Sequence, residues 1–435
     1  TTRRHGAWHA VRADNNRFAY GHSAFPARRL IPKSHSPMKI SVIGAGTIGA
    51  AIARELCARA DEVDQVQVCD TRSRALQALH DTVESRVLRS FQVDARDTNV
   101  LSQILRGSDC VISCVPPELN PGIARLCLNA GVNFCDLGGN DSIVQKELAL
   151  DEEAREKSVW IVPNCGLAPG LINVMCMRGI EQFDTPTAAY LRVGDVPLEP
   201  EEPFNFRISW SAERILDDYT NPAQHIRNGR VVEVDALTGT ETIGFGEEPF
   251  RDMEAFCTQG GLSTLTDALE GKVETLDHKT IRWPGHAHQM RFVIGLGLGE
   301  DRKIGVRTHL TYRDVLVRRM RDRLGGDYED AVLMRIVLHG IKDGREQSLV
   351  YEMVERYNAD TNQTAMMRAT AIPTVVVARL VSENEHVTGG GAAVPENVVP
   401  YDVYADKVAE RGLDIREEWH EGYVSVSGKR SLQEA

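Results

Sequence analysis

Three glycines in the first part of the chain have the spacing that suits a bound pyrophosphate. They form the pattern Gly44-x-Gly46-x-x-Gly49, directly after the apolar segment 39–43 and directly before an Ala-rich helical segment. Gly44 permits a tight turn, Gly46 lets phosphates approach the backbone, and Gly49 lets helix and strand pack closely. The free N–H groups at the start of that helix would face the phosphates. The predicted phosphate-binding loop comprises Gly44, Gly46, Thr47, Ile48 and Gly49.

A carboxylate follows at the position expected for a ribose ligand. Asp70 ends a second apolar strand, 21 residues after Gly49, where it would accept hydrogen bonds from the ribose hydroxyls of NAD. Arg72 and Arg74 are close enough to bind a 2′-phosphate, so the sequence predicts NAD and leaves NADP open. The alternative is a glycine-rich turn in another α/β protein with an acid there by chance. The order of strand, glycines, helix, strand and acid favours the dinucleotide site.

The pattern between residues 38 and 166 predicts a doubly wound parallel sheet, the Rossmann type of α/β fold. Apolar strand segments alternate there with helical segments and short turns. The strands are predicted near 39–43, 65–70, 90–95, 110–115, 133–137 and 159–163, and the helices near 47–59, 72–82, 98–106, 119–130 and 142–157. Ligands bind at the carboxyl ends of such strands. Strands three and four therefore add cofactor-binding candidates, namely Asp94, Ala95, Cys114, Val115 and Pro116.

A second style of patterning begins near residue 187 and predicts an inserted α+β domain with a mostly antiparallel sheet. Alternating segments occur at 188–194, 204–210, 230–236, 291–297 and 303–312. A hairpin is predicted in which Asp343-Gly344 joins strands at 332–339 and 348–355. The predicted divisions are a leader (1–37), a Rossmann NAD(P)-binding domain (38–166), a substrate domain (167–368), and a segment (369–435) with a helix at 371–381 that returns to the Rossmann domain and an acidic surface tail from about 406.

Composition excludes several classes of function. The chain has 435 residues, 42% hydrophobic and 26% charged, with a formal charge of −12. This charge argues against nucleic acid or a membrane surface as partner, and no uninterrupted apolar run reaches the ~20 residues of a membrane span. The nine cysteines include no Cys-x-x-Cys pair and indicate reduced core thiols in a cytoplasmic protein. The His286/His288 pair has no acidic partner at metal-ligand spacing, so no metal site is predicted.

The first 37 residues differ from the rest, with seven Arg or Lys, four His and one acid. We interpret them as a disordered or non-native extension upstream of Met38. An organellar transit peptide is the alternative for such an Arg-rich, acid-poor segment. Exposed β edges in the second domain would suit a homodimer or a higher homo-oligomer.

Later motifs resemble those of the saccharopine dehydrogenase-like family, most closely its lysine 6-dehydrogenase branch. The similar blocks are the glycine loop, Asp136-Leu-Gly-Gly139, the segment 163–173, Thr258-Gln-Gly-Gly261, and the segment 276–286. The likeness covers about residues 38–425. It implies NAD(P)-linked chemistry at the carbon–nitrogen bond of an amino acid or amine. The favoured reaction converts L-lysine to 2-aminoadipate 6-semialdehyde, NADH and ammonia.

Hydride transfer from an amine requires a neutral nitrogen, hence a base, and a cation for the substrate carboxylate. Asp136, at the predicted end of strand five, could hold or deprotonate the substrate amine; a turn-stabilising role is equally compatible with its position. Gly138 and Gly139 suit a close backbone approach of a ligand. Cys165 is a substrate-binding candidate, although packing alone explains a thiol there.

Lys279, Arg282 and His286 form the most distinctive set in the second domain. Lys279 could be a general base, Arg282 could bind the carboxylate, and His286 could move protons. Residues 279 and 282 point to opposite faces of a strand, so all three meet only if Pro284-Gly285 turns the chain. Surface charge and a satisfied core histidine are the alternatives. Further substrate-contact candidates are Thr258, Gly260, Gly261, Arg207, Tyr219 and Arg227.

Two other functions stay open. Saccharopine- or carboxynorspermidine-type chemistry acts on a nitrogen that carries a second carboxylated arm, and would require more cationic side chains in the cleft. A non-catalytic NAD-binding regulatory protein would lack convergent polar groups in the second domain.

Overall fold

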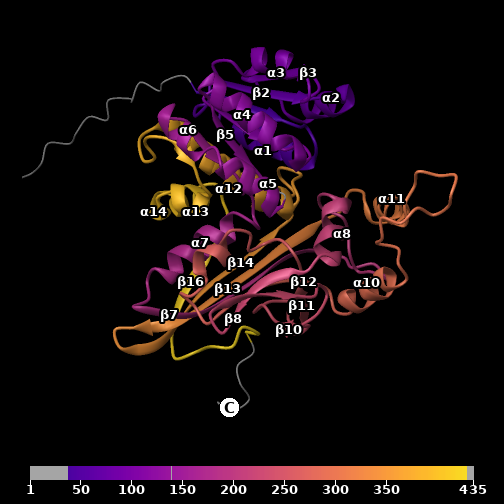
Figure 1. Ribbon diagram of the computed structural model, residues 1–435, viewed down its shortest axis with the longest axis vertical. Coiled ribbons are helices and arrows are strands. Elements are labelled where there is room, and N and C mark those ends of the chain that lie inside the picture. The colour runs from indigo at the N-terminus through magenta and orange to yellow at the C-terminus, as the bar shows by residue number, and fades with distance from the viewer. Residues whose placement is uncertain (1–37, 139, 429–435) are drawn as a thin grey trace, which may run out of the picture. The chain divides into compact units, whose positions relative to one another are not determined.

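The computed structural model of the chain describes residues 38–138 and 140–428. The predicted leader (1–37) and Gly139 lie outside the described residues. Secondary structure follows the chain as two sheets with helices around them (Figure 1). The predicted fold class is confirmed: one sheet is parallel and the other is mostly antiparallel.

The first sheet has seven parallel strands in the order β15-β6-β5-β4-β1-β2-β3. Strand order reverses direction between β1 and β4, and ligands of doubly wound sheets bind at that point. The elements are β1 (Lys39–Ile43), α1 (Thr47–Ala58), β2 (Gln65–Asp70), α2 (Ser73–Thr82), β3 (Leu88–Gln92), α3 (Thr98–Leu105), β4 (Cys110–Ser113), α4 (Asn120–Ala130), β5 (Asn133–Asp136), α5 (Asp141–Leu148), α6 (Asp151–Glu156), β6 (Trp160–Val162) and β15 (Gly391–Ala392).

The second sheet has nine strands, with the main path β10-β11-β12-β7-β13-β14-β16 and with β8 and β9 beside β12. Among the strand pairs of this sheet that the structure describes, only the β12–β7 pair is parallel. The elements are α7 (Leu171–Ile180), β7 (Thr185–Pro197), α8 (Ala212–Thr220), β8 (Ala223–Arg227), β9 (Arg230–Val234), β10 (Glu241–Ile243), β11 (Met253–Cys257), α9 (Leu265–Leu269), β12 (Thr275–Arg282), α10 (His286–Gly295), α11 (Tyr312–Leu324), β13 (Asp330–Lys342), β14 (Arg345–Arg356), α12 (Ala365–Glu383), α13 (Pro395–Val398), α14 (Tyr401–Ala409) and β16 (Arg416–Glu421).

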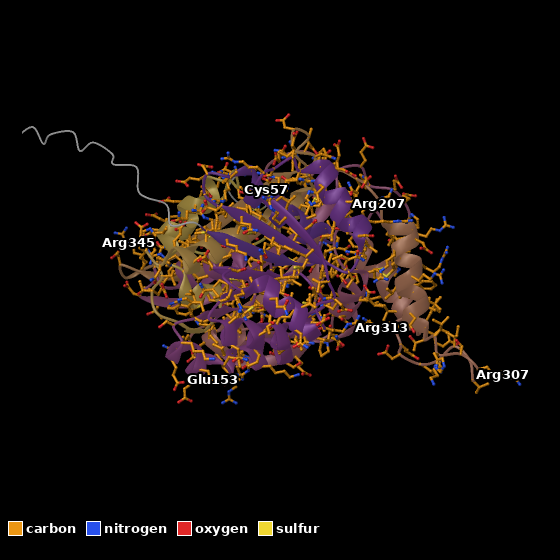
Figure 2. The ribbon with its side chains drawn as sticks, turned by 90° about the horizontal axis from the view of Figure 1, so that it is seen from above. Cys57, Glu153, Arg207, Arg307, Arg313 and Arg345 are labelled. Carbon is orange, nitrogen blue, oxygen red and sulfur yellow. The ribbon has the colours of Figure 1, made fainter. Side chains whose placement is uncertain are left out.

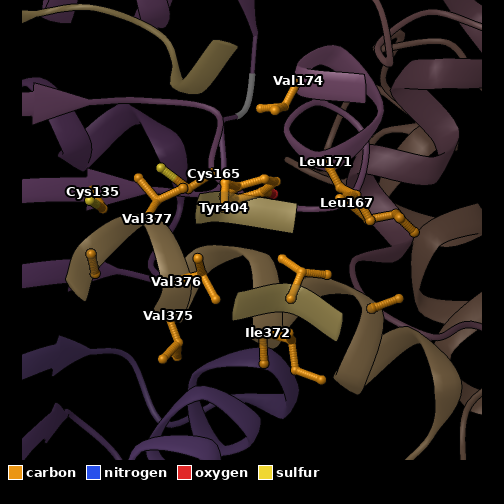
Figure 3. Close-up of a cluster of buried hydrophobic side chains, with 14 of the residues drawn as sticks. Cys135, Cys165, Leu167, Leu171, Val174, Ile372, Val375, Val376, Val377 and Tyr404 are labelled. Atoms are coloured by element: carbon orange, nitrogen blue, oxygen red, sulfur yellow. The ribbon is translucent and has the colours of Figure 1, made fainter. Parts of the chain in front are cut away.

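The long apolar helix α12 joins the two sheets. It packs on strands β4 and β5 of the first sheet and on helix α1 beside them, and on strands β13 and β14 of the second sheet. Figure 3 shows Ile372, Val375, Val376 and Val377 of this helix in a buried cluster that includes Tyr404 of α14. Within the described ranges, α12 is the one helix long and apolar enough to cross a membrane, but 72% of its apolar window is buried inside the fold. That burial is the property of a core helix.

Three predicted strands of the second domain are wrong. In the segment 291–297, residues 291–295 form the last part of α10, whose buried His286, Ala287 and Met290 follow helical spacing. Segment 204–210 alternates because one side packs on the cluster around Phe206, yet it has no strand partner within the described chain. Segment 303–312 is a loop with one isolated bridge between Lys303 and Thr311.

The end of the chain also differs from prediction. The predicted helix 371–381 is the centre of the longer α12, and α13 and α14 follow it. The segment predicted as an acidic surface tail from residue 406 includes β16, which pairs antiparallel with β14. Arg411 and Leu413 are buried: Leu413 belongs to the main hydrophobic cluster, and Arg411 makes ion pairs with Glu55 and Glu62.

Candidate functional site

The glycine loop has the geometry that a close phosphate approach requires. Gly44 has a φ of +102°, and a Cβ there would lie 2.7 Å from the carbonyl oxygen of Cys114. A Cβ on Gly49 would lie 1.9 Å from the carbonyl oxygen of Gly44, whereas one on Gly46 would meet nothing nearer than 3.9 Å. No described side chain caps the first turn of α1, so its N–H groups can bind an anion. The loop therefore fits a dinucleotide pyrophosphate.

A cavity of about 620 Å³, here called the larger cavity, lies against this loop. Its wall includes the buried Asn164, whose Oδ1 has no hydrogen-bond partner in the described structure. A buried orphan acceptor of this kind is satisfied by a polar ligand or water, which adds to the fit of a dinucleotide. The predicted residues that line the larger cavity are Gly46, Thr47, Ile48, Gly49, Cys114, Val115, Pro116, Gly138, Gly260 and Gly261.

Asp70 lies at the carboxyl end of β2 and is tied to the glycine loop. Its Oδ2 accepts a hydrogen bond from the N–H of Ala45 at 2.7 Å, and its Oδ1 accepts from the N–H and Nε of Arg72 at 2.7 and 3.1 Å. Burial opposes ionisation, but the hydrogen bonds from Arg72 and Ala45 lower the pKa of the Asp70 carboxyl. A charged carboxylate beside an exposed guanidinium thus stands at the edge of the loop.

A second cavity, of about 170 Å³ and here called the smaller cavity, adjoins the first. The residues that line both cavities are Ile48, Leu137, Ala168, Pro169, Trp210, Asp218 and Gly261. Of these seven, only Asp218 is ionisable. The two cavities therefore meet at a mostly apolar junction that holds a single carboxyl group.

Asp218 projects from α8 into this junction. Among the residues described, none makes a hydrogen bond or ion pair with its carboxylate. Burial raises the pKa of Asp218 to about 8, although Arg214 and Arg282 lower it. A carboxyl group that changes charge near neutral pH and has no structural partner is suited to hold an amine or to accept its proton.

Arg282 lines the smaller cavity and is oriented by a chain of hydrogen bonds. Its Nη1 donates to Asp195 Oδ1 at 3.0 Å, and its Nε donates to the Tyr219 hydroxyl at 3.2 Å. That hydroxyl lies 3.0 Å from Nε2 of His286, whose Nδ1 lies 3.3 Å from the carbonyl oxygen of Phe204. A carbonyl only accepts, so Nδ1 carries the proton and the hydroxyl donates to Nε2. Burial, with Arg282, lowers the pKa of His286 to about 3.

In this chain of hydrogen bonds, the predicted site residues Arg282, Tyr219 and His286 occupy different positions relative to the cavities. Arg282 and Tyr219 line the smaller cavity, whereas His286 lies behind Tyr219 and lines neither cavity. No described residue accepts a hydrogen bond from Nη2 of Arg282. Nη2 of Arg282 is therefore available to a carboxylate. His286 orients the hydroxyl of Tyr219, and that hydroxyl in turn orients the guanidinium of Arg282.

His278 is a further polar group in the smaller cavity. It is 3% exposed, and neither ring nitrogen has a hydrogen-bond partner among the described residues. Burial lowers its pKa to about 3, so the imidazole is neutral. A Cβ on Gly261 would lie 2.6 Å from its ring, which explains the glycine there. Thr258 lies nearby and shares a 2.7 Å hydrogen bond with Thr280.

Asp136 is an anchor for the backbone rather than part of a cavity wall. Its Oδ1 accepts from the N–H groups of Gly138 and Asn164 at 2.8 and 3.0 Å, and its Oδ2 accepts from Asn120 Nδ2 at 2.7 Å. Burial raises the pKa of Asp136 and of the neighbouring Glu147. Asp136 lines neither cavity. This geometry corresponds to the turn-stabilising alternative.

Lys279 points away from both cavities. Strand alternation on β12 directs His278, Thr280 and Arg282 to the smaller cavity and Lys279 to the opposite face of the sheet. There its Nζ lies 2.5 Å from Oε2 of Glu241. The turn at Pro284-Gly285 comes after β12, so it does not change the faces on which Lys279 and Arg282 lie. The structure therefore does not bring Lys279 to Arg282.

The remaining candidates lie outside the cavity walls. Cys165 is buried, with its Sγ 3.1 Å from the carbonyl oxygen of Val162. Arg207 pairs with Glu201, and Arg227 pairs with Asp277. Asp94 pairs with Arg96 beyond β3, and neither Asp94 nor Ala95 lines a cavity. The nine cysteines are free thiols, and the described residues contain no group of His, Cys, Asp and Glu that could hold a metal ion.

Sequence reasoning missed Asp218, His278, Asn164 and Trp210. The sequence could have predicted His278, because alternation along one strand places it on the same face as Arg282. Asp218 directly precedes Tyr219 on a helix, where a carboxylate has the appearance of an ordinary surface charge. Only the packing of α8 beside the glycine loop reveals its position.

Comparisons with known proteins agree with this architecture. Residues 40–162 match the model of the saccharopine dehydrogenase NADP binding domain, and residues 166–413 match that of the saccharopine dehydrogenase C-terminal domain. The apo saccharopine dehydrogenase (L-Glu forming) of Saccharomyces cerevisiae has the same fold, with a TM-score of 0.71 at 15% identity over 88% of this chain and 100% of that one.

Two relatives are similar in sequence over part of their length. Rat mitochondrial alpha-aminoadipic semialdehyde synthase is 23% identical over 60% of this chain and 28% of its own. The NADP(+)-dependent, L-glutamate-forming saccharopine dehydrogenase of Schizosaccharomyces pombe is 24% identical over 47% of this chain and 45% of its own. The chain thus spans less than half the length of either relative. The two family models together show that the chain, with its NAD(P)-binding domain, belongs to the saccharopine dehydrogenase family.

Proposed function

We propose that this chain catalyses the NAD-dependent oxidation of a side-chain amine in a small amino acid, with L-lysine as the expected substrate. Hydride loss from the amine-bearing carbon to NAD would give an imine and NADH, and hydrolysis of that imine by one water molecule would give 2-aminoadipate 6-semialdehyde and ammonia. The observation that carries the proposal is the Asp218 carboxyl, which has no hydrogen-bond or ion-pair partner among the described residues and is the only ionisable one of those that line both cavities.

The residues of the smaller cavity suit such a substrate. Asp218 would hold the reacting ammonium and accept its proton, because only a neutral amine has the lone pair that drives hydride loss. Arg282, held by Asp195 and Tyr219, would bind the carboxylate through its unoccupied Nη2. The neutral His278 would hydrogen-bond a second polar group of the substrate. The glycine loop and the other residues that line the larger cavity would hold NAD, which would supply a hydride acceptor for the carbon that carries the amine.

The choice of NAD rests on Asp70. A charged carboxylate at the end of β2 favours two ribose hydroxyls and repels a 2′-phosphate. Arg72 supports NADP as the alternative, because it is held beside that carboxylate by two hydrogen bonds to Asp70 and is itself exposed.

Saccharopine-type chemistry is the second candidate, favoured by the names of the relatives. Its substrate carries more carboxylates than lysine. The smaller cavity offers one arginine against two acids, Asp195 and Asp218, which supports an amine-rich substrate with few carboxylates. Convergent polar groups in this cavity argue against a non-catalytic protein.

The test is NADH formation, followed by absorbance, with lysine, ornithine, diaminopimelate, saccharopine and carboxynorspermidine, each with NAD and NADP. The proposal expects turnover of lysine with release of ammonia. It also expects Asp218→Asn to lower kcat/KM at least ~100-fold while NAD affinity, measured by calorimetry, stays within ~2-fold. The exposed Asp267→Asn is the matched control. Turnover of saccharopine alone would establish the second candidate, and NAD binding without any turnover would favour the non-catalytic one.

We also propose that the protein acts in the cytoplasm as a homo-oligomer. The nine free thiols support a reducing compartment. Cell fractionation with an antibody to the chain tests the location, and recovery in an organelle would instead support the transit-peptide alternative.

A further inference from the structure

Asn164 has a hydrogen-bond acceptor that its surroundings leave open toward the larger cavity. The side chain is 1% exposed, and its Oδ1 has no hydrogen-bond partner among the described residues. Of the described residues that line the larger cavity, Asn164 alone has a buried side-chain oxygen or nitrogen in this state. Such an atom costs free energy unless a ligand or a water molecule donates to it. Asn164 therefore marks a place where a bound donor would be stabilised.

Neighbouring groups determine which atom of the Asn164 amide is open. Nδ2 donates to the hydroxyl of Ser263 at 3.0 Å, and that hydroxyl donates to Oδ1 of Asp141 at 3.1 Å. Because a carboxylate only accepts, the hydroxyl gives its proton to Asp141 and accepts from the amide. The amide must therefore present its NH2 group to Ser263, and the open atom is the oxygen.

The backbone holds this oxygen in a fixed position. Asn164 has a φ of +64°, in the left-handed region that is uncommon for residues other than glycine. Its N–H donates to Oδ1 of the buried Asp136 at 3.0 Å, and the same oxygen accepts from the N–H of Gly138 at 2.8 Å. A Cβ on Gly138 would lie 2.3 Å from Oδ1 of Asn164, so the glycine leaves that atom accessible. An uncommon backbone conformation that several hydrogen bonds maintain is typical of a functional site.

Two acids of α8 in the wall of the larger cavity, Asp217 and Glu213, are already engaged by arginines. Asp217 accepts from Nη1 of Arg214 at 3.4 Å and from Nη2 of Arg313, which Figure 2 labels, at 2.5 Å. Glu213 pairs with Arg321. The charge of both carboxylates is thereby compensated, so neither competes strongly for a neutral donor that enters the cavity.

The position of Asn164 indicates which donor it meets. Asn164 lines only the larger cavity, but a Cβ on Gly138 would also lie 3.2 Å from Pro169, which lines both cavities. The proposed hydride transfer, on which this step rests, requires the nicotinamide ring near that junction. The NH2 of its carboxamide is the one hydrogen-bond donor that a nicotinamide ring carries. A neutral amide donor suits a neutral amide acceptor, whereas a substrate ammonium is better stabilised by the carboxyl of Asp218.

We propose that Oδ1 of Asn164 accepts a hydrogen bond from the carboxamide NH2 of the nicotinamide ring. Ser263 and Asp136 are positioning residues, because one orients the amide and the other holds its backbone. The contact is the same for NAD and NADP, since both carry this carboxamide, and it does not depend on which amine is oxidised.

The test is calorimetric titration of the full chain with NAD, with ADP-ribose, and with the 3-acetylpyridine analogue of NAD, in which a methyl group replaces the carboxamide NH2. Wild type should bind NAD at least ~10-fold more tightly than the analogue. Asn164→Gly, which tolerates the left-handed backbone, should bind NAD about tenfold more weakly and lose the preference for NAD over the analogue. Its affinity for ADP-ribose, which lacks the ring, should stay within ~2-fold of wild type. No substrate is present, so a failure of the proposed reaction would not affect the result.

Asn228→Gly is the matched control, because Asn228 has a φ of +51° in the exposed turn between β8 and β9. It should leave all three affinities within ~2-fold of wild type. Ser263→Gly, at a residue whose φ is +42°, frees the amide to turn and should reduce the preference for NAD by a smaller factor. Circular dichroism checks that each variant is folded, and the comparison of NAD with the analogue on wild type needs no variant.

An equal loss of affinity for NAD and ADP-ribose in Asn164→Gly would place the contact at a ribose or a phosphate and would overturn the proposal. A wild type that binds NAD and the analogue equally well would also overturn it. If Asn164→Gly raises the KM for lysine while its NAD affinity is unchanged, the donor is the substrate amine and the nicotinamide contact is excluded.

Discussion

The hydroxyl of Tyr219 lies 3.0 Å from Nε2 of His286. Because the carbonyl of Phe204 fixes the imidazole tautomer, this contact turns the hydroxyl proton toward His286 and its lone pair toward Nε of Arg282. Arg282 is the only arginine among the described residues that line the smaller cavity, and its orientation thus depends on a histidine that lines neither cavity.

We predict that Tyr219→Phe raises the KM for a carboxylate-bearing substrate about tenfold, since Arg282 loses one of the acceptors that hold it. The thermal midpoint should also fall, because Nε2 of His286 and Nε of Arg282 are left unpaired. KM measured for lysine and for an amine without a carboxylate separates the effects. A lower midpoint with unchanged KM for both would show that the chain of hydrogen bonds only stabilises the fold.

Lys279→Met should leave kcat and KM within ~2-fold, because Lys279 faces away from both cavities. Its loss removes one partner of Glu241, which keeps its 2.5 Å contact to Arg192, so we expect a destabilisation of about 1–2 kcal/mol. Urea denaturation and steady-state rates are the measurements. Arg282→Lys is the contrasting variant and should raise KM. Loss of turnover in Lys279→Met at normal stability would restore Lys279 as the base.

Asp70→Ala should weaken NAD at least ~10-fold and NADP much less. The substitution removes a ribose ligand for NAD, and it also releases Arg72, which can then bind a 2′-phosphate. Calorimetric titration with both dinucleotides checks this. Equal losses for both would mean that Asp70 only shapes the loop through its 2.7 Å contact to Ala45.

His225 provides a test of pH-dependent stability. It is fully buried on β8, lines neither cavity, and burial lowers its pKa from 6.5 to about 4. Below pH 6.5 the unfolded chain binds a proton at His225 that the folded chain does not bind. The free energy of unfolding therefore falls as the pH is lowered from 6.5 toward 4.

His225→Leu should abolish that loss. The stability of the variant relative to wild type should therefore rise by about 2 kcal/mol between about pH 7.5 and about pH 5. Urea unfolding at the two pH values measures the difference, and any packing change cancels in the comparison. A pH-independent difference would mean that His225 binds its proton equally well in both states.

Local patterns determined much of the first half of the chain. The glycine loop, the acid that ends β2 and the alternation of strands and helices are set by neighbours in sequence, because tight turns, helix starts and strand ends depend on a few adjacent residues. The hairpin of β13 and β14 was predictable for the same reason, since Asp343-Gly344 makes a turn of its own accord. In segment 204–210, regular alternation led to the wrong prediction of a strand, because one side of the segment is buried although it pairs with no described strand.

The site itself was decided by tertiary structure. Asp218 and the glycine loop are about 170 residues apart in sequence, and their approach depends on how α8 packs across the two cavities. The family resemblance identified the block that contains Arg282, but it did not show which side of β12 faces the ligand. Strand alternation places Lys279 and Arg282 on opposite faces of β12. Only the packing of the sheet decides which face lines a cavity and which face carries the ion pair of Lys279 with Glu241. The sequence by itself therefore determined the cofactor loop, whose geometry is local, whereas the substrate residues come from distant segments whose meeting is a property of packing.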